Sequence, residues 1–328
     1  MPAITASASA KLILLGEHAV VYGHPAIAIP FSDMRLHVTV EPAILAKPGS
    51  LRVISTDMQS DQLFYEMSDD QPIKQMIILL LEYLGIKSIP SCTLRISSQI
   101  PLGAGFGSSA ALAVGIMRAL SAFLGHSLAE KELDQLAYQS EQFIHGRLSG
   151  IDTTVIAWEQ AIYYQRGHAV EVLKPLNTLH FVIADSGERT PTVQSVAYLA
   201  MRLEREETII KPRFHEIEKQ VITAKHALHI GDQQMLGEAM NQNQNILVDL
   251  GLSSPMLGKL VSAAREAGAL GAKLSGGGQG GALIALTKTE TQAELAEALI
   301  SAGAANVWTT DLPGNQLSFP SSLRRTIP

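Results

Sequence analysis

A glycine-rich stretch at residues 100–111 carries the clearest chemical signal in the chain. It reads IPLGAGFGSSAA, and a helical pattern from Ala110 to Phe123 follows at once. The free amides and the dipole of a helix N-terminus favour anions, and Ser108 and Ser109 offer hydroxyls to a phosphate or to its Mg²⁺. A helix cap alone would need only one serine. The stretch therefore predicts a phosphate-binding loop.

Two familiar nucleotide loops do not fit these residues. A dinucleotide-binding loop needs a third glycine where this chain has Ser108, and an acidic residue about twenty positions on, where it has Phe123 and Leu124. A P-loop ends in Gly-Lys-Ser/Thr, whereas Gly258-Lys259 continues with leucine. The loop is thus a phosphate loop of another kind.

An apolar run near the N-terminus has Lys11 at one end and Glu17 with His18 at the other. The lysine can neutralise a phosphate or lower the pKa of a nearby hydroxyl, and the acid and imidazole can hydrogen-bond a polar substrate. A solvated lysine at a strand edge is the alternative. On their own these residues do not indicate a function, and their interpretation depends on the other motifs.

A third cluster lies at residues 141–152, where Glu141 ends a helical pattern and Asp152 follows Ser149-Gly150 at the start of the next element. A kinase needs one carboxylate on Mg²⁺ and another within reach of the acceptor hydroxyl. The alternatives are an N-cap role for Asp152 and a solvated helix face for Glu141.

A second glycine loop occupies residues 276–281, with five glycines in six positions between two strand-like runs. So many glycines cost chain entropy, which a mere turn does not justify. The loop predicts close approach of the backbone to a ligand, rather than a flexible linker.

The composition limits the class of protein. The 328 residues suit two domains, and 46% hydrophobic with 17% charged residues is typical of a globular chain. A net charge of −6 gives no basic field for nucleic acid or an anionic membrane, and the longest apolar run, at residues 76–84, is too short to span a bilayer. The single Cys92 and the absence of a signal-like N-terminus favour the cytoplasm, and the ten histidines follow no metal-binding spacing.

The periodicity predicts an α+β chain with a boundary at residues 174–177. The first unit, 1–178, has strands at 11–15, 35–40, 51–55, 92–97, 158–164 and 170–173, with helices at 73–83, 110–123 and from a capping box of Ser127 and Glu130. The second unit, 179–328, has a strand at 179–184, helices over 193–268 divided near Pro212, Gly231 and residues 253–255, a strand before the second glycine loop, a strand at 282–286, a helix at 291–301 and a strand at 307–310. The division also allows the last strand or the tail to pack against the first unit.

The motifs at 16–23, 101–111, 145–152 and 272–281 together resemble the signature motifs of the GHMP kinase superfamily, in the same order. They are most similar to the members that phosphorylate mevalonate, since a galactose-specific member would have Thr-Asp after His18 and a homoserine-specific one would lack Asp152. The resemblance implies an N-terminal ribosomal-S5-like domain and a C-terminal ferredoxin-like domain, with ATP and substrate between them. Another small-molecule kinase, a decarboxylase acting on a phosphorylated mevalonate, and a non-catalytic ligand-sensing relative are the alternatives.

The resemblance also implies residue roles. Asp152 would be the base for the C5 hydroxyl of mevalonate, Lys11 would support that hydroxyl and the phosphoryl group, and Ser109 and Glu141 would hold Mg²⁺. The ATP contacts would be Pro101, Gly103, Ala104, Gly105, Gly107, Ser108 and Ser109. The substrate contacts would be Glu17, His18, Ser149, Gly150, Thr192, Gly276, Gly277 and Gly278, with Thr190 as a further hydroxyl.

Three departures from the family pattern affect loop geometry and not catalytic groups. Ser9-Ala10 replaces Pro-Gly before the lysine, Leu148 replaces a proline, and Gln279 interrupts the glycine run. Enzymes acting on a phosphorylated substrate need extra cations, for which only Arg147 and Arg189 flank the motifs. A homodimer is one possible assembly, and the sequence does not decide the number of subunits.

Overall fold

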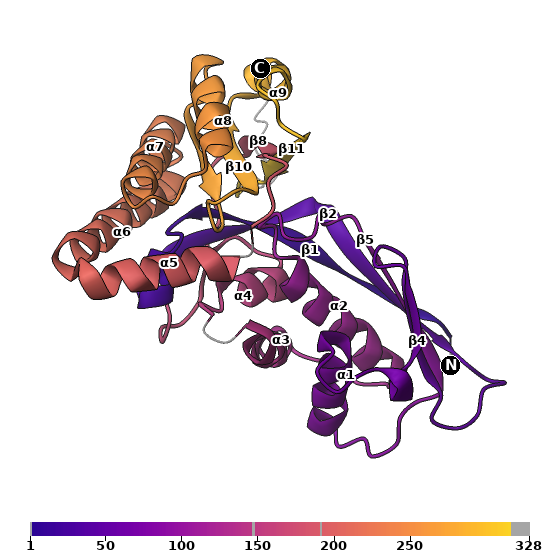
Figure 1. Cartoon of the computed structure of the whole chain (residues 1–328). Helices are drawn as coiled ribbons and strands as arrows, with labels where there is room; N and C mark the ends of the chain where they lie inside the picture. The colour runs from indigo at the N-terminus through magenta and orange to yellow at the C-terminus, as the bar shows by residue number, and fades with distance from the viewer. Residues whose placement is uncertain (1, 146–147, 191, 316–328) are drawn as a thin grey trace, which may run out of the picture.

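The computed structural model describes residues 2–145, 148–190 and 192–315. Within them the chain forms two sheets, each with its own helices (Figure 1). The first sheet has the order β4-β3-β5-β2-β6-β7, and β1 also pairs with β2. Its strands are β1 (Ile4–Leu15), β2 (Ala26–Pro42), β3 (Leu51–Ser55), β4 (Ser60–Leu63), β5 (Cys92–Ser98), β6 (Ile162–Tyr164) and β7 (Glu171–Val172).

Strand β1 is the element on which the site is built. It pairs antiparallel with β2, and the register shifts between Ser9 and Ala10 and again near its end. Residues 8–15 are all buried, because helices of the first unit cover one side and elements of the second unit contact the other. A strand buried on both faces reads as a continuous apolar run, which explains the sequence pattern around Lys11.

Four helices accompany the first sheet: α1 (Pro72–Tyr83), α2 (Ser108–Phe123), α3 (Glu130–His145) and α4 (Ile151–Trp158). Figure 1 shows them on one side of the long strands β1 and β2. Helix α2 approaches these strands closely at Gly115, where a Cβ atom would lie 2.8 Å from Leu36 and 3.1 Å from Val38. Short 3-10 helices, η1 (Ala19–Tyr22) and η2 (Phe64–Glu66), complete this unit.

The second sheet is antiparallel, with the order β11-β8-β10-β9. Its strands follow a β-α-β-β-α-β sequence, which is the ferredoxin-like arrangement. They are β8 (Leu179–Asp185), β9 (Gly271–Ser275), β10 (Ala282–Thr287) and β11 (Asn306–Leu312). The helices are α5 (Thr192–Arg205), α6 (Glu207–Ile230), α7 (Gln233–Asp249), α8 (Pro255–Glu266) and α9 (Gln292–Ser301), with η3 (Thr289–Thr291) before the last.

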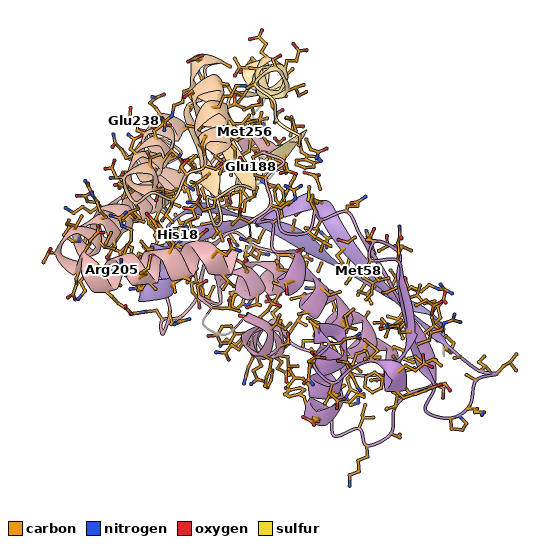
Figure 2. All side chains as sticks on the ribbon, in the orientation of Figure 1. His18, Met58, Glu188, Arg205, Glu238 and Met256 are labelled. Atoms are coloured by element: carbon orange, nitrogen blue, oxygen red, sulfur yellow. The ribbon has the colours of Figure 1, made fainter. Side chains whose placement is uncertain are left out.

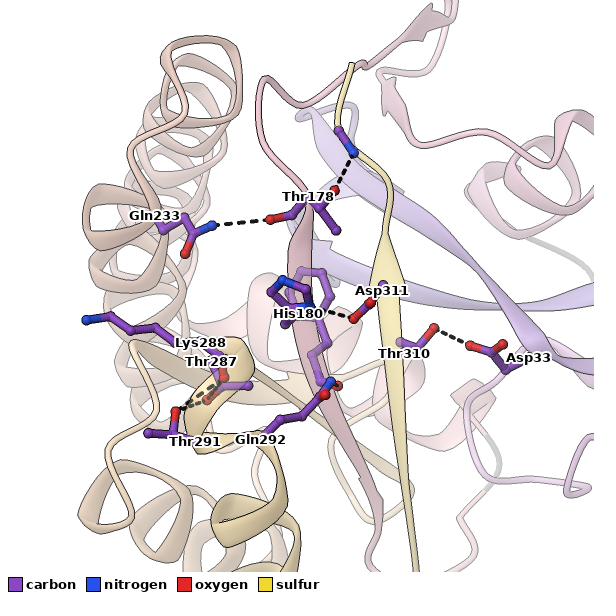
Figure 3. Close-up of polar contacts among 12 residues, drawn as sticks. Asp33, Thr178, His180, Gln233, Thr287, Lys288, Thr291, Gln292, Thr310 and Asp311 are labelled. Atoms are coloured by element: carbon purple, nitrogen blue, oxygen red, sulfur yellow. Dashed lines mark hydrogen bonds and ion pairs between the residues drawn. The ribbon is translucent and has the colours of Figure 1, made fainter. Parts of the chain in front are cut away.

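Polar contacts tie the second sheet to its surroundings (Figure 3). Thr310 on β11 donates a hydrogen bond to Asp33 on β2 (2.6 Å), and His180 on β8 contacts Asp311 across the strands (2.8 Å). Strand β11 therefore links the two sheets. The division at residues 178 and 179 stays a prediction, and the tail from residue 316 lies outside the described residues. Among the described helices, none is long and apolar enough to cross a membrane.

The predicted strand at 158–164 is wrong in its first half. Residues 151–158 form helix α4, and only Ile162–Tyr164 is a strand. Trp158 is the last residue of the helix, and Glu159 caps it with a positive φ of 48°. The backbone therefore turns after Trp158, and the strand begins only at Ile162.

Other helix boundaries also differ from prediction. The capping box at Ser127 and Glu130 is wrong, because α3 begins at Glu130 and Glu132 accepts the hydrogen bond from the Ala129 amide (2.8 Å). Pro212 does not divide two helices, since it lies inside α6, and the break falls earlier, at Glu206. Strand β2 is also much longer than the predicted 35–40, and β4 was not predicted.

Candidate active site

The first glycine loop leads directly into α2. Gly103, Gly105 and Gly107 all have positive φ, and Gly107 is the N-cap, so no side chain caps this helix. The loop is held to β1 by a hydrogen bond from the Lys11 amide to the Phe106 carbonyl (3.0 Å). The start of α2, where Ser108 and Ser109 lie, is therefore fixed beside β1 with the polarity that favours an anion.

Lys11 and Asp152 form an ion pair at this point. The Lys11 Nζ atom lies 3.1 Å from Asp152 Oδ1, and the lysine side chain is 3% exposed while that of the aspartate is 41% exposed. The aliphatic part of the lysine passes over Gly107, where a Cβ atom would lie 2.9 Å from Lys11 Cγ. The cation is thus fixed inside the fold, and its carboxylate partner stays accessible.

Ser109 and Glu141 form a second pair next to the first. The Ser109 hydroxyl donates to Glu141 Oε1 (2.5 Å). Burial, together with the negative charge of Asp152, raises the pKa of the Glu141 carboxyl to about 7, although the Ser109 hydrogen bond opposes the rise. A buried carboxylate beside another carboxylate is an environment that a cation would stabilise.

Helix α4 positions Asp152 in its first turn. The N-cap, Gly150, has a φ of 92°, and a Cβ atom there would lie 2.6 Å from the Tyr164 hydroxyl, which donates to the Ser149 carbonyl (2.5 Å). Hydroxyls of Thr153 and Thr154 donate to the Gly150 carbonyl (3.0 and 2.9 Å). Ser149 and Gly150 therefore shape the turn that presents Asp152.

The second glycine loop lies against the first. A Cβ atom on Gly276 would lie 3.5 Å from Gly105, and one on Gly281 would lie 2.8 Å from the Ala104 carbonyl. A Cβ atom on Gly278 would overlap the Leu252 carbonyl. Backbone packing between the two units explains Gly276 and Gly281, and packing within the second unit explains Gly278. A ligand contact at Gly276, Gly277 and Gly278 stays a prediction.

Glu17 is fully buried and forms an ion pair with Lys273 on β9. Asn243 on α7 donates a weak hydrogen bond to its other oxygen (3.4 Å). Burial raises the pKa of Glu17 and lowers that of Lys273, while their mutual attraction opposes both shifts. Sequence reasoning gave Lys273 and Asn243 no role, and the only signal was a lysine in an otherwise apolar strand.

His18, labelled in Figure 2, follows the end of β1 and contacts the second glycine loop. Its Nε2 donates to the Gly277 carbonyl (3.2 Å), and its backbone has a φ of 63°, which is rare outside glycine. Burial lowers the pKa of the imidazole to about 4. His18 is therefore neutral at physiological pH, with its proton on Nε2.

The residues after β8 also border the first loop. Arg189 forms two hydrogen bonds with the buried Asp185 (2.7 and 2.6 Å), and its side chain lies 3.7 Å from the Cβ position of Gly103. Thr190 donates to the Gln279 carbonyl (2.6 Å), so its hydroxyl holds the second loop. The side chain of Thr192 and the residue Arg147 lie outside the described part of the chain.

The structure thus brings Lys11, Ser109, Glu141 and Asp152 together from four elements, behind a glycine loop that opens onto a helix N-terminus. Paired carboxylates, a fixed cation and a phosphate loop are the parts that phosphoryl transfer needs. The family models for the GHMP kinases N terminal domain and the GHMP kinases C terminal match residues 71–160 and 224–305. Fold and site together define an ATP-dependent small-molecule kinase of the GHMP class.

The chain is 38% identical to the mevalonate kinase of Thermococcus sibiricus and 36% identical to that of Pyrococcus furiosus, over 92% of this chain and 93% of each relative. The crystal structure of L. major mevalonate kinase in complex with R-mevalonate superposes with a TM-score of 0.80 at 26% identity, covering 95% of this chain and 96% of that one. The chain belongs to the mevalonate kinase family. These comparisons confirm the predicted two-domain fold.

Proposed function

We propose that this chain transfers the γ-phosphoryl group of ATP to the C5 hydroxyl of mevalonate, giving 5-phosphomevalonate and ADP. The observation that carries the proposal is the Lys11–Asp152 pair, which lies next to Ser109 and Glu141 at the start of α2. The relatives named mevalonate kinase, and the L. major structure with R-mevalonate, support the choice of substrate.

Asp152 is assigned as the base. Its carboxylate accepts the proton of the hydroxyl while the hydroxyl oxygen forms a bond to the γ-phosphorus. The bond between that phosphorus and the bridging oxygen breaks, and ADP leaves. Lys11 stabilises the same reaction. Its ammonium group lies where negative charge develops on the oxygens of the phosphoryl group during transfer.

The donor set at the start of α2 fits Mg²⁺. Ser109 provides a hydroxyl and Glu141 a carboxylate, and both are the hard oxygen ligands that this ion takes. Their present hydrogen bond already places the two groups together. When bound, the ion would neutralise charge on the phosphates of ATP.

The remaining assignments follow the motifs. Residues 101–109 bind the ATP phosphates through backbone amides of the loop and of the first turn of α2. His18, Ser149 and Gly150 border the substrate, as do Thr192 and the loop from Gly276 to Gly278. Glu17 is a positioning residue. Lys273 holds its carboxylate, and this ion pair fixes the segment that carries His18 beside the substrate.

The alternatives have less support. An enzyme acting on a phosphorylated mevalonate needs free cations, and Arg189 is committed to Asp185 through two hydrogen bonds. A non-catalytic relative has no need of a base, whereas Asp152 and Lys11 are both present and in contact. We also assign the chain to isoprenoid formation in the cytoplasm, as a homodimer without nucleic-acid or membrane partners.

A substrate panel tests the function. Purified chain with Mg²⁺ and ATP is given mevalonate, 5-phosphomevalonate, galactose or homoserine, and ADP release is followed by a coupled assay. Mevalonate should give ADP in proportion to substrate consumed, and the other three should not. ADP release with 5-phosphomevalonate but not with mevalonate would contradict the proposal.

A further inference from the structure

A group of three side chains lies apart from the phosphate loop, at the contact between the two units. His24 lies in the turn between η1 and β2, and His215 and Glu218 lie on α6. One donor atom from each lies within 4.8 Å of the others. His215 and Glu218 are three residues apart, so they project from the same face of the helix.

The lone pairs of these groups are directed by their other contacts. His215 Nδ1 donates to the Lys211 carbonyl (2.9 Å), which leaves the lone pair on Nε2. His24 Nδ1 donates to Glu218 Oε2 (2.7 Å), a hydrogen bond whose proton an ion would displace, and the two imidazole rings meet edge to face with centroids 5.0 Å apart. A histidine whose second nitrogen is held by a carbonyl is the usual arrangement of a metal ligand.

The backbone that carries these side chains is fixed. Phe214, next to His215, is buried and stacks on Tyr22 with centroids 4.8 Å apart. The His24 ring contacts the same Phe214 ring, at 5.8 Å. The His24 amide also donates to the Ala19 carbonyl (3.2 Å). Only the ends of the three side chains need to adjust for a ligand to enter.

We propose that His24, His215 and Glu218 bind a divalent transition-metal ion of the zinc class, with water in the open position. Two imidazoles and one carboxylate suit Zn²⁺ and not Mg²⁺, which prefers oxygen. Ligand distances of about 2.1 Å place tetrahedral donors about 3.4 Å apart. Since every separation in the group is within 4.8 Å, none must close by more than about 1.4 Å, which is within reach of side-chain rotation.

The ion would link the two units close to the segment that borders the proposed substrate site. His24 follows the segment that carries Glu17 and His18, whereas α6 belongs to the second unit. Binding to the folded chain alone raises stability by mass action. This site is separate from the oxygen ligands Ser109 and Glu141, so its occupancy does not depend on nucleotide.

The test uses the full chain, stripped with EDTA and dialysed, without nucleotide. Titration with ZnCl₂ at pH 7.5 in a calorimeter should show one ion per chain, and the melting temperature should rise on adding ZnCl₂ but not MgCl₂. His215→Ala and Glu218→Gln should each weaken Zn²⁺ binding at least tenfold. His226→Ala, which removes an exposed histidine on the same helix, should leave the affinity unchanged.

Two results would overturn the site. One is no saturable heat and no thermal shift with ZnCl₂. The other is a Zn²⁺ affinity that survives both His215→Ala and Glu218→Gln, which would place the ion elsewhere. Since His215 is exposed, its replacement keeps the fold, and circular dichroism of each metal-free variant verifies this. None of these readouts involves ADP release, so the result is independent of the proposed kinase activity.

Discussion

Lys11 Nζ contacts Asp152 Oδ1 at 3.1 Å, and the two groups differ sharply in exposure, at 3% for the lysine and 41% for the aspartate. The lysine comes from the buried strand β1, and the aspartate comes from the first turn of α4. The ammonium group is therefore preorganised, whereas the carboxylate can exchange its partner for a substrate hydroxyl. This asymmetry is what a base next to a transferring phosphoryl group requires.

Gly107→Ala should lower kcat at least tenfold. The new Cβ atom would lie 2.9 Å from Lys11 Cγ and 3.1 Å from Ile156, so the lysine must move, and small displacements of a catalytic group are costly. Gly125→Ala is the matched control, since it has a similar φ, 83° against 78°, but nothing within 4 Å. Steady-state kinetics on both variants measures the difference. Equal losses in both would attribute the effect to backbone strain.

Glu141→Gln should raise the Mg²⁺ concentration needed for half-maximal activity by tenfold or more. The amide keeps the shape and the contact with Ser109, but it removes the negative charge that attracts the ion. Activity is measured against free Mg²⁺ at saturating ATP. Glu130→Gln, an exposed change at the start of the same helix, serves as control. An unchanged Mg²⁺ requirement for Glu141→Gln would exclude this carboxylate as a ligand.

His18 should make the fold sensitive to acid. Its pKa is lowered from 6.5 to about 4 by burial, so the unfolded chain binds the proton first, and stability falls as pH drops from 6.5 to 4. The loss amounts to about 3 kcal/mol at 1.36 kcal/mol per pKa unit. Between pH 7 and pH 4, the free energy of unfolding of His18→Gln should fall by about 3 kcal/mol less than that of the unsubstituted chain. Urea denaturation at the two pH values measures both. Strain at the positive φ affects the variant equally at both pH values. Parallel pH profiles would show that His18 does not titrate on unfolding.

Lys273→Met should destabilise the fold by about 3–5 kcal/mol, because it leaves the Glu17 carboxylate buried without its partner. The double variant Glu17→Gln with Lys273→Met should be less destabilised than the sum of the two single variants. Chemical denaturation of all three gives the coupling. Strict additivity would mean that the two charges do not stabilise each other.

The parts of the site whose residues are close together in the sequence could be predicted from it. The phosphate loop before α2 follows from glycines and serines in one stretch, and its helix ends at Phe123 as predicted. The sequence could not reveal Asn243 or Lys273 as partners of Glu17, because these contacts join segments more than 200 residues apart. For the same reason, the spacing of the histidines gave no hint that His24 meets α6.

Periodicity gave no secondary structure for residues 151–157, the element that carries Asp152. The residues of α4 are mostly apolar or β-branched, which favours a strand. The positive φ of Gly150 and the hydroxyl contacts of Thr153 and Thr154 start a helix there. Asp152 was placed correctly at a junction, but its direction toward Lys11 depends on packing between α4 and β1, which periodicity does not encode.

The assignment of Asp152 as base is tested most directly by single-turnover phosphoryl transfer in Asp152→Asn, with enzyme in excess over ATP and with saturating mevalonate. The rate should fall by about 10²–10⁴-fold relative to the unsubstituted chain, while the affinities for ATP and mevalonate stay within a few fold. A single-turnover rate that is unchanged in the folded variant would contradict the account.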